Sequence, residues 1–291
     1  MDTFAFIIHP IDPKRDVSRK FPRLGKYLTV GQINFLSTFF PPVYISEITG
    51  VRSAATGKEI KGWFVACPYM PQRMLELPAP VVYRKIVQTG RLAEKLGARL
   101  LGLGAFTSVV GDGGLTIASR LSIPVTTGDS YTVAVAVEAV REAARQLRLP
   151  LPASTAAVVG ATGAIGAVAA ELIAREVGRL WLIGRPGRAA ALEAVRERIM
   201  ARAPAEVRVG TDLAGLAQAD LILTVTSAVE AVIEPEHLKP GAVVCDVARP
   251  RDVSARVAAV RDDVLVIDGG MVAVPGDVDF HFNFGFPPGM A

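Results

Sequence analysis

The chain has 291 residues, a length typical of two α/β domains and too great for one small module. Half of the residues (51%) are hydrophobic and the mean hydropathy is +0.36, which excludes an intrinsically disordered protein. The net charge of +4 is divided unevenly. Residues 1–150 carry 19 basic and 11 acidic side chains (+8), whereas residues 151–291 carry 13 and 17 (−4). The basic half would attract an acidic partner.

The chain lacks the sequence features of a secreted or membrane-spanning protein. Charged residues from Asp12 onward follow the short apolar start, unlike the pattern of a signal peptide. The longest run without charges, residues 149–170, is long enough to cross a bilayer, but two prolines and three glycines interrupt it. Two cysteines are too few for a disulfide scaffold and fit a reducing compartment. We therefore expect a soluble, cytoplasmic protein without an integral membrane segment.

Apolar patterns predict the secondary structure of the first 150 residues. Short apolar runs bounded by turn-forming residues predict strands at residues 4–8, 43–48, 62–66 and 100–103. Apolar positions recurring every three or four residues predict helices at residues 81–96 and 130–147. The sequence Leu-Pro-Leu-Pro at 149–152 ends the second helix, because proline cannot continue it. We place a domain boundary there and expect a substrate domain over residues 1–150.

Strands and helices alternate more regularly after residue 150. Strands are predicted at residues 156–159, 180–183, 207–209, 221–225, 242–247 and 264–267. Helices at residues 163–177 and 189–202 separate the first three of them. Such alternation builds a parallel sheet with crossover connections. The predicted fold class is therefore α/β, with an N-terminal α/β substrate domain and a C-terminal Rossmann domain at residues 151–291 that binds NAD(P) on a parallel sheet.

A glycine-rich turn lies between the first strand and the first helix of this second domain. Glycines at such a turn let the backbone approach a pyrophosphate, whose charge meets the N–H groups at the start of the helix. The alternative is a turn in which the glycines serve packing alone, but the surrounding strand–turn–helix–strand order favours a dinucleotide site. The predicted cofactor-binding residues of the turn are Gly160, Ala161, Thr162, Gly163, Ala164, Ile165 and Gly166.

The end of the second strand of this domain predicts which dinucleotide binds. An NAD site usually presents a carboxylate there, but residues 184–188 read Gly-Arg-Pro-Gly-Arg and contain no acid. Arg185 and Arg188 can hold a 2′-phosphate through charge-assisted hydrogen bonds, which predicts NADP (NADPH) as the cofactor. The alternative is a pair of solvated arginines after a turn.

Thr226 and Ser227 follow the strand at 221–225, at the carboxyl edge where a Rossmann sheet holds its cofactor. Two readings stay open for these small polar residues. They could line the nicotinamide side of the site, and we include both among the predicted cofactor-binding residues. Equally, they could serve only to cap the strand.

The sequence shows no metal site and no nucleic-acid site. His9, His237 and His281 are far apart, and neither HExxH nor CxxC occurs. Asp277 and Asp279 alternate with apolar residues up to His281, a pattern that a half-buried strand explains without a cation. Basic residues are dispersed rather than interleaved with aromatic ones, which argues against a nucleic-acid partner.

Two further segments have alternative roles. Cys67 would need a lowered pKa to act as a nucleophile, and a small core residue is the more usual role of a lone cysteine in an apolar segment. Cys245, inside a predicted buried strand, is expected to be a core residue. Residues 126–130 (Thr-Thr-Gly-Asp-Ser) precede a predicted helix and fit an N-cap, a role compatible with facing a cleft.

Several short motifs follow one another along the chain in a fixed order. They lie at residues 53–62 (SAATGKEIKG), 67–75 (CPYMPQRML), 103–108 (LGAFTS), 126–129 (TTGD), 160–166 (GATGAIG) and 268–279 (DGGMVAVPGDVD). In this order and spacing they resemble the motifs of the long-chain fatty acyl-[acyl-carrier-protein] reductases (aldehyde-forming). More distantly, the two-domain plan resembles that of the shikimate-type dehydrogenases.

The resemblance implies NADPH-dependent reduction of an acyl thioester to a fatty aldehyde, with an acyl carrier protein or acyl-CoA as the partner. In the family, a cysteine attacks the thioester, the carrier thiol leaves, and hydride reduces the acyl-enzyme. That cysteine follows the stretch resembling residues 287–291, so Cys67 and Cys245 match positions that are not nucleophilic, and no catalytic residue is assigned. Either the natural chain continues, or this homologue works without covalent catalysis.

Two other functions stay open. One is a shikimate-type NADP-dependent dehydrogenase that acts on a small hydroxy acid or ketone. This reaction needs no cysteine, but no lysine–aspartate pair is convincingly placed for proton transfer. The other is a non-catalytic NADP-binding homologue.

Overall fold

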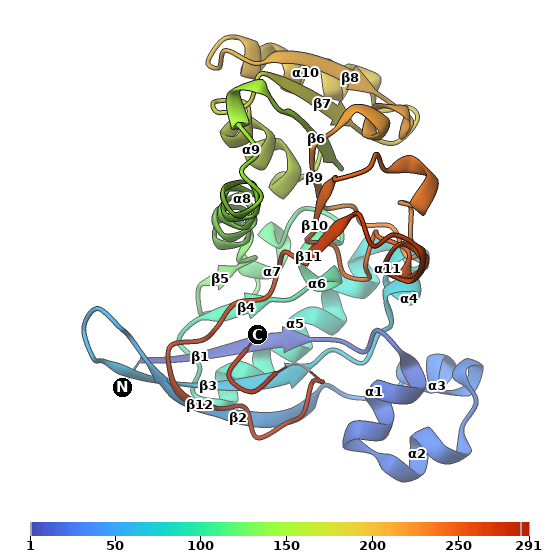
Figure 1. Cartoon of the computed structure of the whole chain (residues 1–291). Helices are drawn as coiled ribbons and strands as arrows, with labels where there is room; N and C mark the ends of the chain where they lie inside the picture. Colours follow the sequence, from blue (N-terminus) through green and yellow to red (C-terminus); the bar gives the residue numbers. More distant parts are fainter. Residues whose placement is uncertain (1, 286, 291) are drawn as a thin grey trace. The chain divides into compact units, whose positions relative to one another are not determined.

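The structure is a computed structural model that describes residues 2–285 and 287–290. It divides into two compact units, one formed by Met1–Gly128 with Val272–Ala291 and the other by Asp129–Met271. Each unit contains a six-stranded sheet with helices, which confirms the predicted α/β class (Figure 1). Met1 and Ala291, the outer ends of the two predicted domains, lie outside the described residues.

A mixed sheet forms the centre of the first unit, in the order β12-β2-β3-β1-β4-β5. Strand β1 pairs in parallel with β3 and β4, and β5 continues the parallel half. On the other side, β2 runs antiparallel to β3, and β12 runs antiparallel to β2. The strands are β1 (Asp2–Ile8), β2 (Val43–Arg52), β3 (Glu59–Ala66), β4 (Leu101–Leu103), β5 (Val125–Thr126) and β12 (Gly276–Asp279).

The helices of the first unit fall into two groups. Helix α5 confirms the prediction for residues 81–96, and its buried side chains Val82 and Ile86 pack in the core of this sheet. Three short helices, α1 to α3, occupy a part of the chain for which the sequence predicted no helix or strand. Their starts are fixed locally: the Asp12 side chain accepts from the Arg15 N–H, and Thr29 forms a capping box with Gln32. The helices are α1 (Pro13–Lys20), α2 (Pro22–Tyr27), α3 (Val30–Ser37), α4 (Pro71–Glu76), α5 (Ala79–Leu96), α6 (Phe106–Val109) and α7 (Leu115–Ala118).

The second unit has the Rossmann strand order. Its six strands are all parallel and run β11-β10-β9-β6-β7-β8, so that the order reverses between β6 and β9. All residues of the two central strands β6 and β9 are buried, as expected for a parallel sheet covered on both faces. The strands are β6 (Thr155–Val159), β7 (Arg179–Ile183), β8 (Glu206–Gly210), β9 (Leu221–Thr224), β10 (Val243–Asp246) and β11 (Leu265–Asp268).

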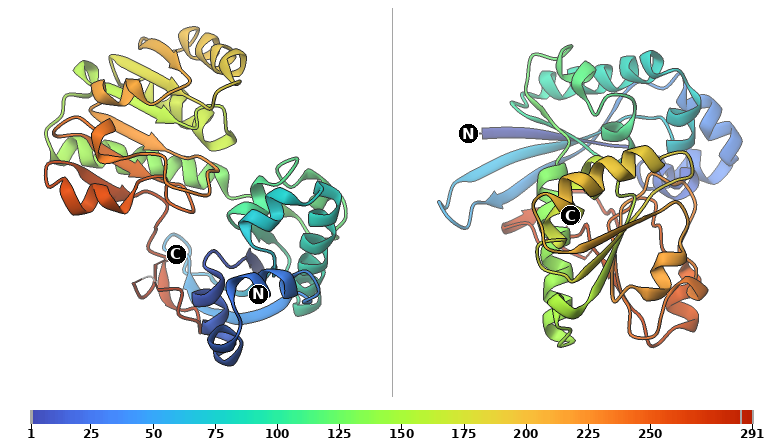
Figure 2. Two further views of the ribbon diagram at one scale, coloured as in Figure 1. Left: turned by 90° about the vertical axis from the view of Figure 1, so that its right-hand side faces the viewer. Right: turned by 90° about the horizontal axis from the view of Figure 1, so that it is seen from above.

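Helices lie on both sides of this sheet (Figure 2), and a hydrophobic core lies on each face. The first is filled by α8, α9 and α10, and the second by shorter elements that include α11. The elements that cover the sheet are α8 (Asp129–Gln146), α9 (Ala164–Ile173), α10 (Ala189–Met200), α11 (Ala255–Val260) and the 3₁₀ turns η1 (Leu151–Ala153), η2 (Ala214–Gln218) and η3 (Pro235–His237).

The limits of the compact units differ from a single division at residue 150. Helix α8 belongs to the second unit, because Val133, Val137 and Val140 on its buried face pack in the core of the Rossmann sheet. Helix α8 ends at Gln146, ahead of the proline-rich residues 149–152, and those residues connect two elements of the same unit. Residues 272–291 return to the first unit, where β12 pairs with β2. Both departures depend on partners that are distant in the sequence.

Every helix among the described residues is too short or too polar to cross a membrane.

Candidate cofactor-binding site

The glycine turn lies between β6 and α9, where the sequence predicted it. The N–H groups of Gly160 and Ala161 both donate to the Ile183 carbonyl oxygen, at 2.9 and 3.1 Å, which ties the turn to the end of β7. Gly160 has φ +84°, and a Cβ at this position would lie 2.5 Å from the Val225 carbonyl oxygen. The residue must therefore be glycine both for its backbone conformation and for the space it leaves.

Helix α9 begins close against this turn. A Cβ on Gly166 would lie 2.3 Å from the Gly160 carbonyl oxygen, so the absence of a side chain lets the helix approach the turn. No side chain caps the helix at Gly163, and in the described part of the chain Ala167 supplies the first N–H that donates back, to the Gly163 carbonyl oxygen. Gly163 and Ala164 are exposed. The helix thus presents uncapped N–H donors to solvent, an arrangement that fits the pyrophosphate of a dinucleotide.

Two arginines follow the end of β7. Arg185 and Arg188 are exposed and flank Gly187, which has φ +84°. Neither guanidinium forms an ion pair within residues 2–285 and 287–290, and residues 184–188 contain no carboxylate. The loop after the second Rossmann strand therefore offers two uncommitted cations where a dinucleotide places its adenosine ribose.

A buried carboxylate holds the loop after β9. Asp252 is 0% exposed and accepts hydrogen bonds from the Thr224 hydroxyl at 2.6 Å, from the Thr226 N–H at 2.8 Å and from the Thr226 hydroxyl. The Thr226 hydroxyl also accepts from the Ala228 N–H at 3.1 Å. The only proton that the Thr226 hydroxyl can donate is thus used within the protein, whereas Ser227 beside it is exposed. The geometry gives Thr226 a part in fixing the loop and leaves Ser227 facing solvent at this edge.

A second buried acid stands at the end of β10. Asp246 is 2% exposed and accepts from the N–H groups of Ala248 and Val253, each at 3.0 Å. Burial raises the pKa of this carboxyl, and the charge of Asp252 raises it further. Asp246 and Asp252 were not recognised from the sequence as related, because only folding brings them together. One feature of the sequence could have identified Asp246: it lies near the end of a predicted buried strand, where Rossmann sheets carry their site residues.

The carboxyl edge of the first sheet also contains unusual groups. His9, directly after β1, is buried; its Nε2 accepts from the Phe106 N–H at 3.1 Å, so Nδ1 donates to the Pro10 carbonyl oxygen. Burial lowers the pKa of His9 and favours this neutral form. Ala105, after β4, has φ +44° and ψ −123°, a conformation that L-residues rarely adopt. Strained backbone of this kind concentrates at functional sites, and the sequence pattern gave no sign of it.

Both cysteines are core residues, as the sequence favoured. Cys67 and Cys245 are 0% exposed, and burial raises the pKa of their thiols to about 11 and about 12. A thiol with so high a pKa supplies little thiolate at neutral pH. Neither residue has the properties of a catalytic nucleophile.

The polar residues near β12 do not share one strand face. The strand ends at Asp279, and His281 beyond it has φ +47°. His281 contacts the Asp279 carboxylate at 3.1 Å and the Thr49 hydroxyl at 3.1 Å. Within the described residues, no group of three or more acidic, histidine or cysteine side chains is arranged to hold a metal ion.

The fold and the glycine turn define the class: an α/β protein with a Rossmann unit of the kind that binds nicotinamide dinucleotides. The family model of shikimate / quinate 5-dehydrogenases matches residues 141–268. A long-chain acyl-[acyl-carrier-protein] reductase of Synechococcus elongatus is 30% identical over 294 residues, covering 96% of this chain and 81% of the relative. The chain belongs to the family of this acyl-[acyl-carrier-protein] reductase.

Other similar proteins share less with the chain. The aminotransferase PigE of a Serratia species is 31% identical over 225 residues, which is 76% of this chain but only 26% of that longer protein. Among solved structures, L-tryptophan dehydrogenase from Nostoc punctiforme has 14% identity and a TM-score of 0.43, with 91% of this chain and 68% of that chain covered. Glutamyl-tRNA reductase from Methanopyrus kandleri has 20% identity and a TM-score of 0.37, with 64% and 46% covered.

Proposed function

We propose that the chain catalyses NADPH-dependent reduction of a long-chain acyl thioester, carried by acyl carrier protein or coenzyme A, to a fatty aldehyde. The observation that carries the proposal is the 30% identity with a long-chain acyl-[acyl-carrier-protein] reductase over 96% of this chain. The uncapped start of α9 and the glycine turn before it support a dinucleotide cofactor.

The geometry of the Rossmann unit supports a proposed set of cofactor contacts. In this proposal the glycine turn at residues 160–166 holds the pyrophosphate through the uncapped N–H groups at the start of α9, and Arg185 and Arg188 hold the 2′-phosphate of NADPH. Asp252 keeps the loop of Thr226 and Ser227 in place at the nicotinamide side. When bound, NADPH supplies the hydride for the reduction.

The substrate side of the proposal rests on the first unit. Residues 1–150 carry a net charge of +8, which favours an acidic carrier such as acyl carrier protein. The strained Ala105 and the buried His9 at the carboxyl edge of the first sheet are candidates for positioning the thioester. Two unpaired, buried cysteines support a cytoplasmic location as part of the same proposal.

Turnover assays test the reaction. NADPH oxidation is followed with long-chain acyl-[acyl-carrier-protein], with long-chain acyl-CoA and with a panel of small hydroxy acids and ketones, and the aldehyde is identified by mass spectrometry. Aldehyde formed from a thioester supports the proposal. Hydride transfer only with a small ketone or hydroxy acid would contradict it and favour a dehydrogenase of the shikimate type, whose family model covers residues 141–268. Tight NADPH binding without turnover by the full natural chain would identify a non-catalytic homologue.

A binding titration tests the choice of NADPH. Each phosphate contact that is lost should weaken NADPH binding by about 1.5–3 kcal/mol, roughly 10- to 150-fold in Kd. The double variant Arg185→Ala/Arg188→Ala should therefore weaken NADPH binding by at least this much and leave NADH binding nearly unchanged. Arg202→Ala, an exposed arginine after α10, is the matched control and should change neither affinity. Equal weakening of NADPH and NADH binding in the double variant would refute the 2′-phosphate assignment.

A further inference from the structure

The amino-terminal segment from Ile11 to Tyr44, which contains α1, α2 and α3, exposes an unusual amount of apolar surface. Of the 19 large apolar side chains that are exposed among the described residues, eight lie in this segment. Tyr27 is 74% exposed, Phe39 71% and Phe35 63%. Surface apolar residues are normally scattered, so a concentration in one short segment points to a contact with something outside the chain. The eight are Ile11, Tyr27, Val30, Phe35, Leu36, Phe39, Phe40 and Tyr44.

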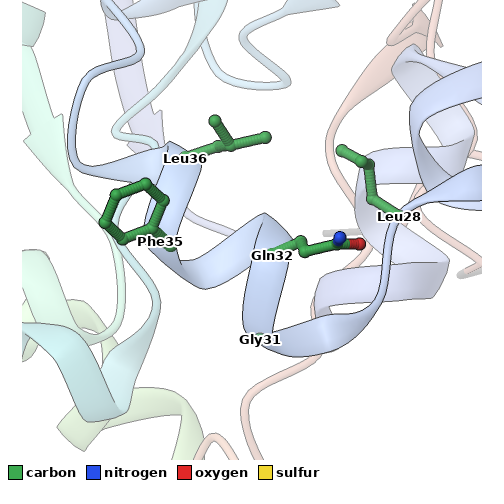
Figure 3. Close-up of a pocket in the computed structure, with 5 residues that line it drawn as sticks. All are labelled: Leu28, Gly31, Gln32, Phe35 and Leu36. Atoms are coloured by element: carbon green, nitrogen blue, oxygen red, sulfur yellow. The ribbon is translucent and has the colours of Figure 1, made fainter.

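Exposed apolar side chains also lie along α3. Ile33 and Ser37 are the buried residues of this helix, Phe35 lies on the opposite side, and Gly31 and Leu36 are exposed as well. A shallow groove of about 350 Å³ is lined there by Leu28, Gly31, Gln32, Phe35 and Leu36 (Figure 3). The Phe35 and Phe39 rings meet edge to face at 5.5 Å, which extends the surface past the end of the helix.

The same segment is strongly basic. Residues 11–44 contain two acids, Asp12 and Asp16, against six basic residues, so their net charge of +4 equals that of the whole chain. Arg19 pairs with Asp16 at 3.1 Å, and the Lys26 ammonium lies 5.4 Å from the centre of the Tyr27 ring. Four of the six are exposed and form no ion pair within the described residues. These four are Lys14, Arg15, Arg23 and Lys26.

We propose that this segment docks the protein on the surface of an anionic lipid bilayer. The aromatic side chains of α3 and the following loop enter the headgroup region, and the exposed lysines and arginines of α1 and α2 meet lipid phosphates. Cations beside exposed aromatic and aliphatic side chains are the combination that interfacial helices use. An acidic protein partner would also account for the cations, and the experiment below separates that outcome from a bilayer. The proposal does not rest on the proposed reaction.

Sedimentation with lipid vesicles tests the proposal. The chain should bind vesicles of phosphatidylcholine mixed with phosphatidylglycerol, and bind phosphatidylcholine alone far more weakly. Arg23→Gln/Lys26→Gln should reduce binding more than tenfold, since each basic residue near an anionic surface contributes about fivefold. Phe35→Ser/Phe39→Ser should also reduce it more than tenfold without unfolding the protein, because both rings are exposed. The matched controls are Lys95→Gln/Arg120→Gln and Leu115→Ser, exposed residues outside the segment, which should bind like the parent.

A fluorescent label gives a second measurement that does not depend on affinity. Cys67 and Cys245 are buried, with the pKa of each thiol raised, so a cysteine introduced by Phe39→Cys is labelled selectively. A polarity-sensitive label at position 39 should shift to the blue with anionic vesicles, and one introduced by Leu115→Cys should not. No binding to anionic vesicles by the parent would overturn the proposal, as would equal binding by parent and segment variants. If the segment variants instead lose only affinity for acidic acyl carrier protein, the surface serves a protein partner and the bilayer proposal is wrong.

Discussion

The two six-stranded sheets of the protein differ in strand direction and in the contacts that fix the segments joined to them. The Rossmann sheet of the second unit is wholly parallel, its central strands are buried on both faces, and its glycine turn is fixed by backbone atoms of β6, β7 and β9. The sheet of the first unit is mixed, and one of its edge strands, β12, comes from the far end of the chain. There, aromatic side chains that follow β12 pack on Phe64. Backbone contacts tolerate little change, whereas side-chain contacts can loosen gradually.

Two glycines with the same backbone conformation test the first half of this comparison, and the largest effect is expected here. Gly160 and Gly187 both have φ +84°, but a Cβ would lie 2.5 Å from the Val225 carbonyl oxygen at position 160 and would meet nothing within 4 Å at position 187. Gly187→Ala should cost only the conformational strain, about 1–2 kcal/mol. Gly160→Ala should cost about 3–5 kcal/mol and abolish dinucleotide binding, because backbone must move.

Denaturant unfolding and NADPH titration of both glycine variants measure the two effects. The parent chain and the two variants are compared at one pH and one temperature. Similar losses of stability at positions 160 and 187 would show that conformational strain alone, and not the closeness of the Val225 carbonyl oxygen, makes glycine necessary at position 160.

Two phenylalanines test the second half of the comparison. The Phe284 ring contacts Phe64 with 4.6 Å between centroids and Phe282 with 4.8 Å, in the aromatic cluster that follows β12. Phe284→Ala should lower the free energy of unfolding by about 2–3 kcal/mol, less than a fully buried ring would. Phe39→Ala, which removes a ring that is 71% exposed, is the control and should change stability by less than about 0.5 kcal/mol.

Hydrogen exchange of the β2 backbone amides shows where the Phe284→Ala variant loses stability. In Phe284→Ala, protection should fall in β2, the partner of β12, while β6 and β9 of the other unit stay protected. Uniform loss of protection in both sheets would mean that the two units unfold together and that the comparison between them does not hold.

An ion pair in the second unit should make a smaller contribution to stability, and this contribution should depend on pH. Asp220 accepts hydrogen bonds from the Thr155 N–H at 2.7 Å and from Lys239 at 2.5 Å. Burial alone would raise the pKa of this carboxyl, but the hydrogen bonds and the charge of Lys239 lower it below 3.8 overall. A pKa lowered on folding means that the carboxylate stabilises the protein above pH 3.8. This contribution is lost as the pH falls through the pKa of the folded state.

The Asp220→Ala variant should therefore be less stable than the parent by about 1–2 kcal/mol at neutral pH, with the difference shrinking below pH 3.8. Unfolding in urea at a series of pH values measures it. The exposed Glu230 supplies the control, and Glu230→Ala should follow the parent at every pH. A difference that grows on acidification would have the wrong sign for a carboxyl whose pKa is lowered by folding.

Local sequence patterns correctly predicted the elements whose partners are near in the chain. The turn at 160–166 lies between a strand and a helix as predicted, and β6, β7 and β9 lie within a few residues of the predicted ranges. These strands are mostly apolar because both faces of a parallel sheet are covered, so their composition reveals them. Whether the turn binds NADPH stays a prediction that the titrations above test.

The helices α1 to α3 were missed because their apolar side chains do not form the stripe of a buried helix. Only one residue of α2 and two of α3 are buried, and α1 buries none. Sequence patterns recognise helices by the periodic face that they bury, so helices that bury almost nothing give a weak signal. The capping residues Asp12 and Thr29 are visible in the sequence. Such residues locate the start of a helix only when other features already predict a helix there.

The sequence by itself determined the α/β class, the alternation of the Rossmann strands and helices, and the glycine turn with its two arginines. All of these depend on residues that are neighbours along the chain. Only the tertiary structure decided that α8 packs with the second sheet, that β12 pairs with β2, and that Asp252 meets Thr224 and Thr226. These contacts join residues distant in the sequence and are chosen by burial and hydrogen-bond satisfaction in the whole fold, which no local pattern contains.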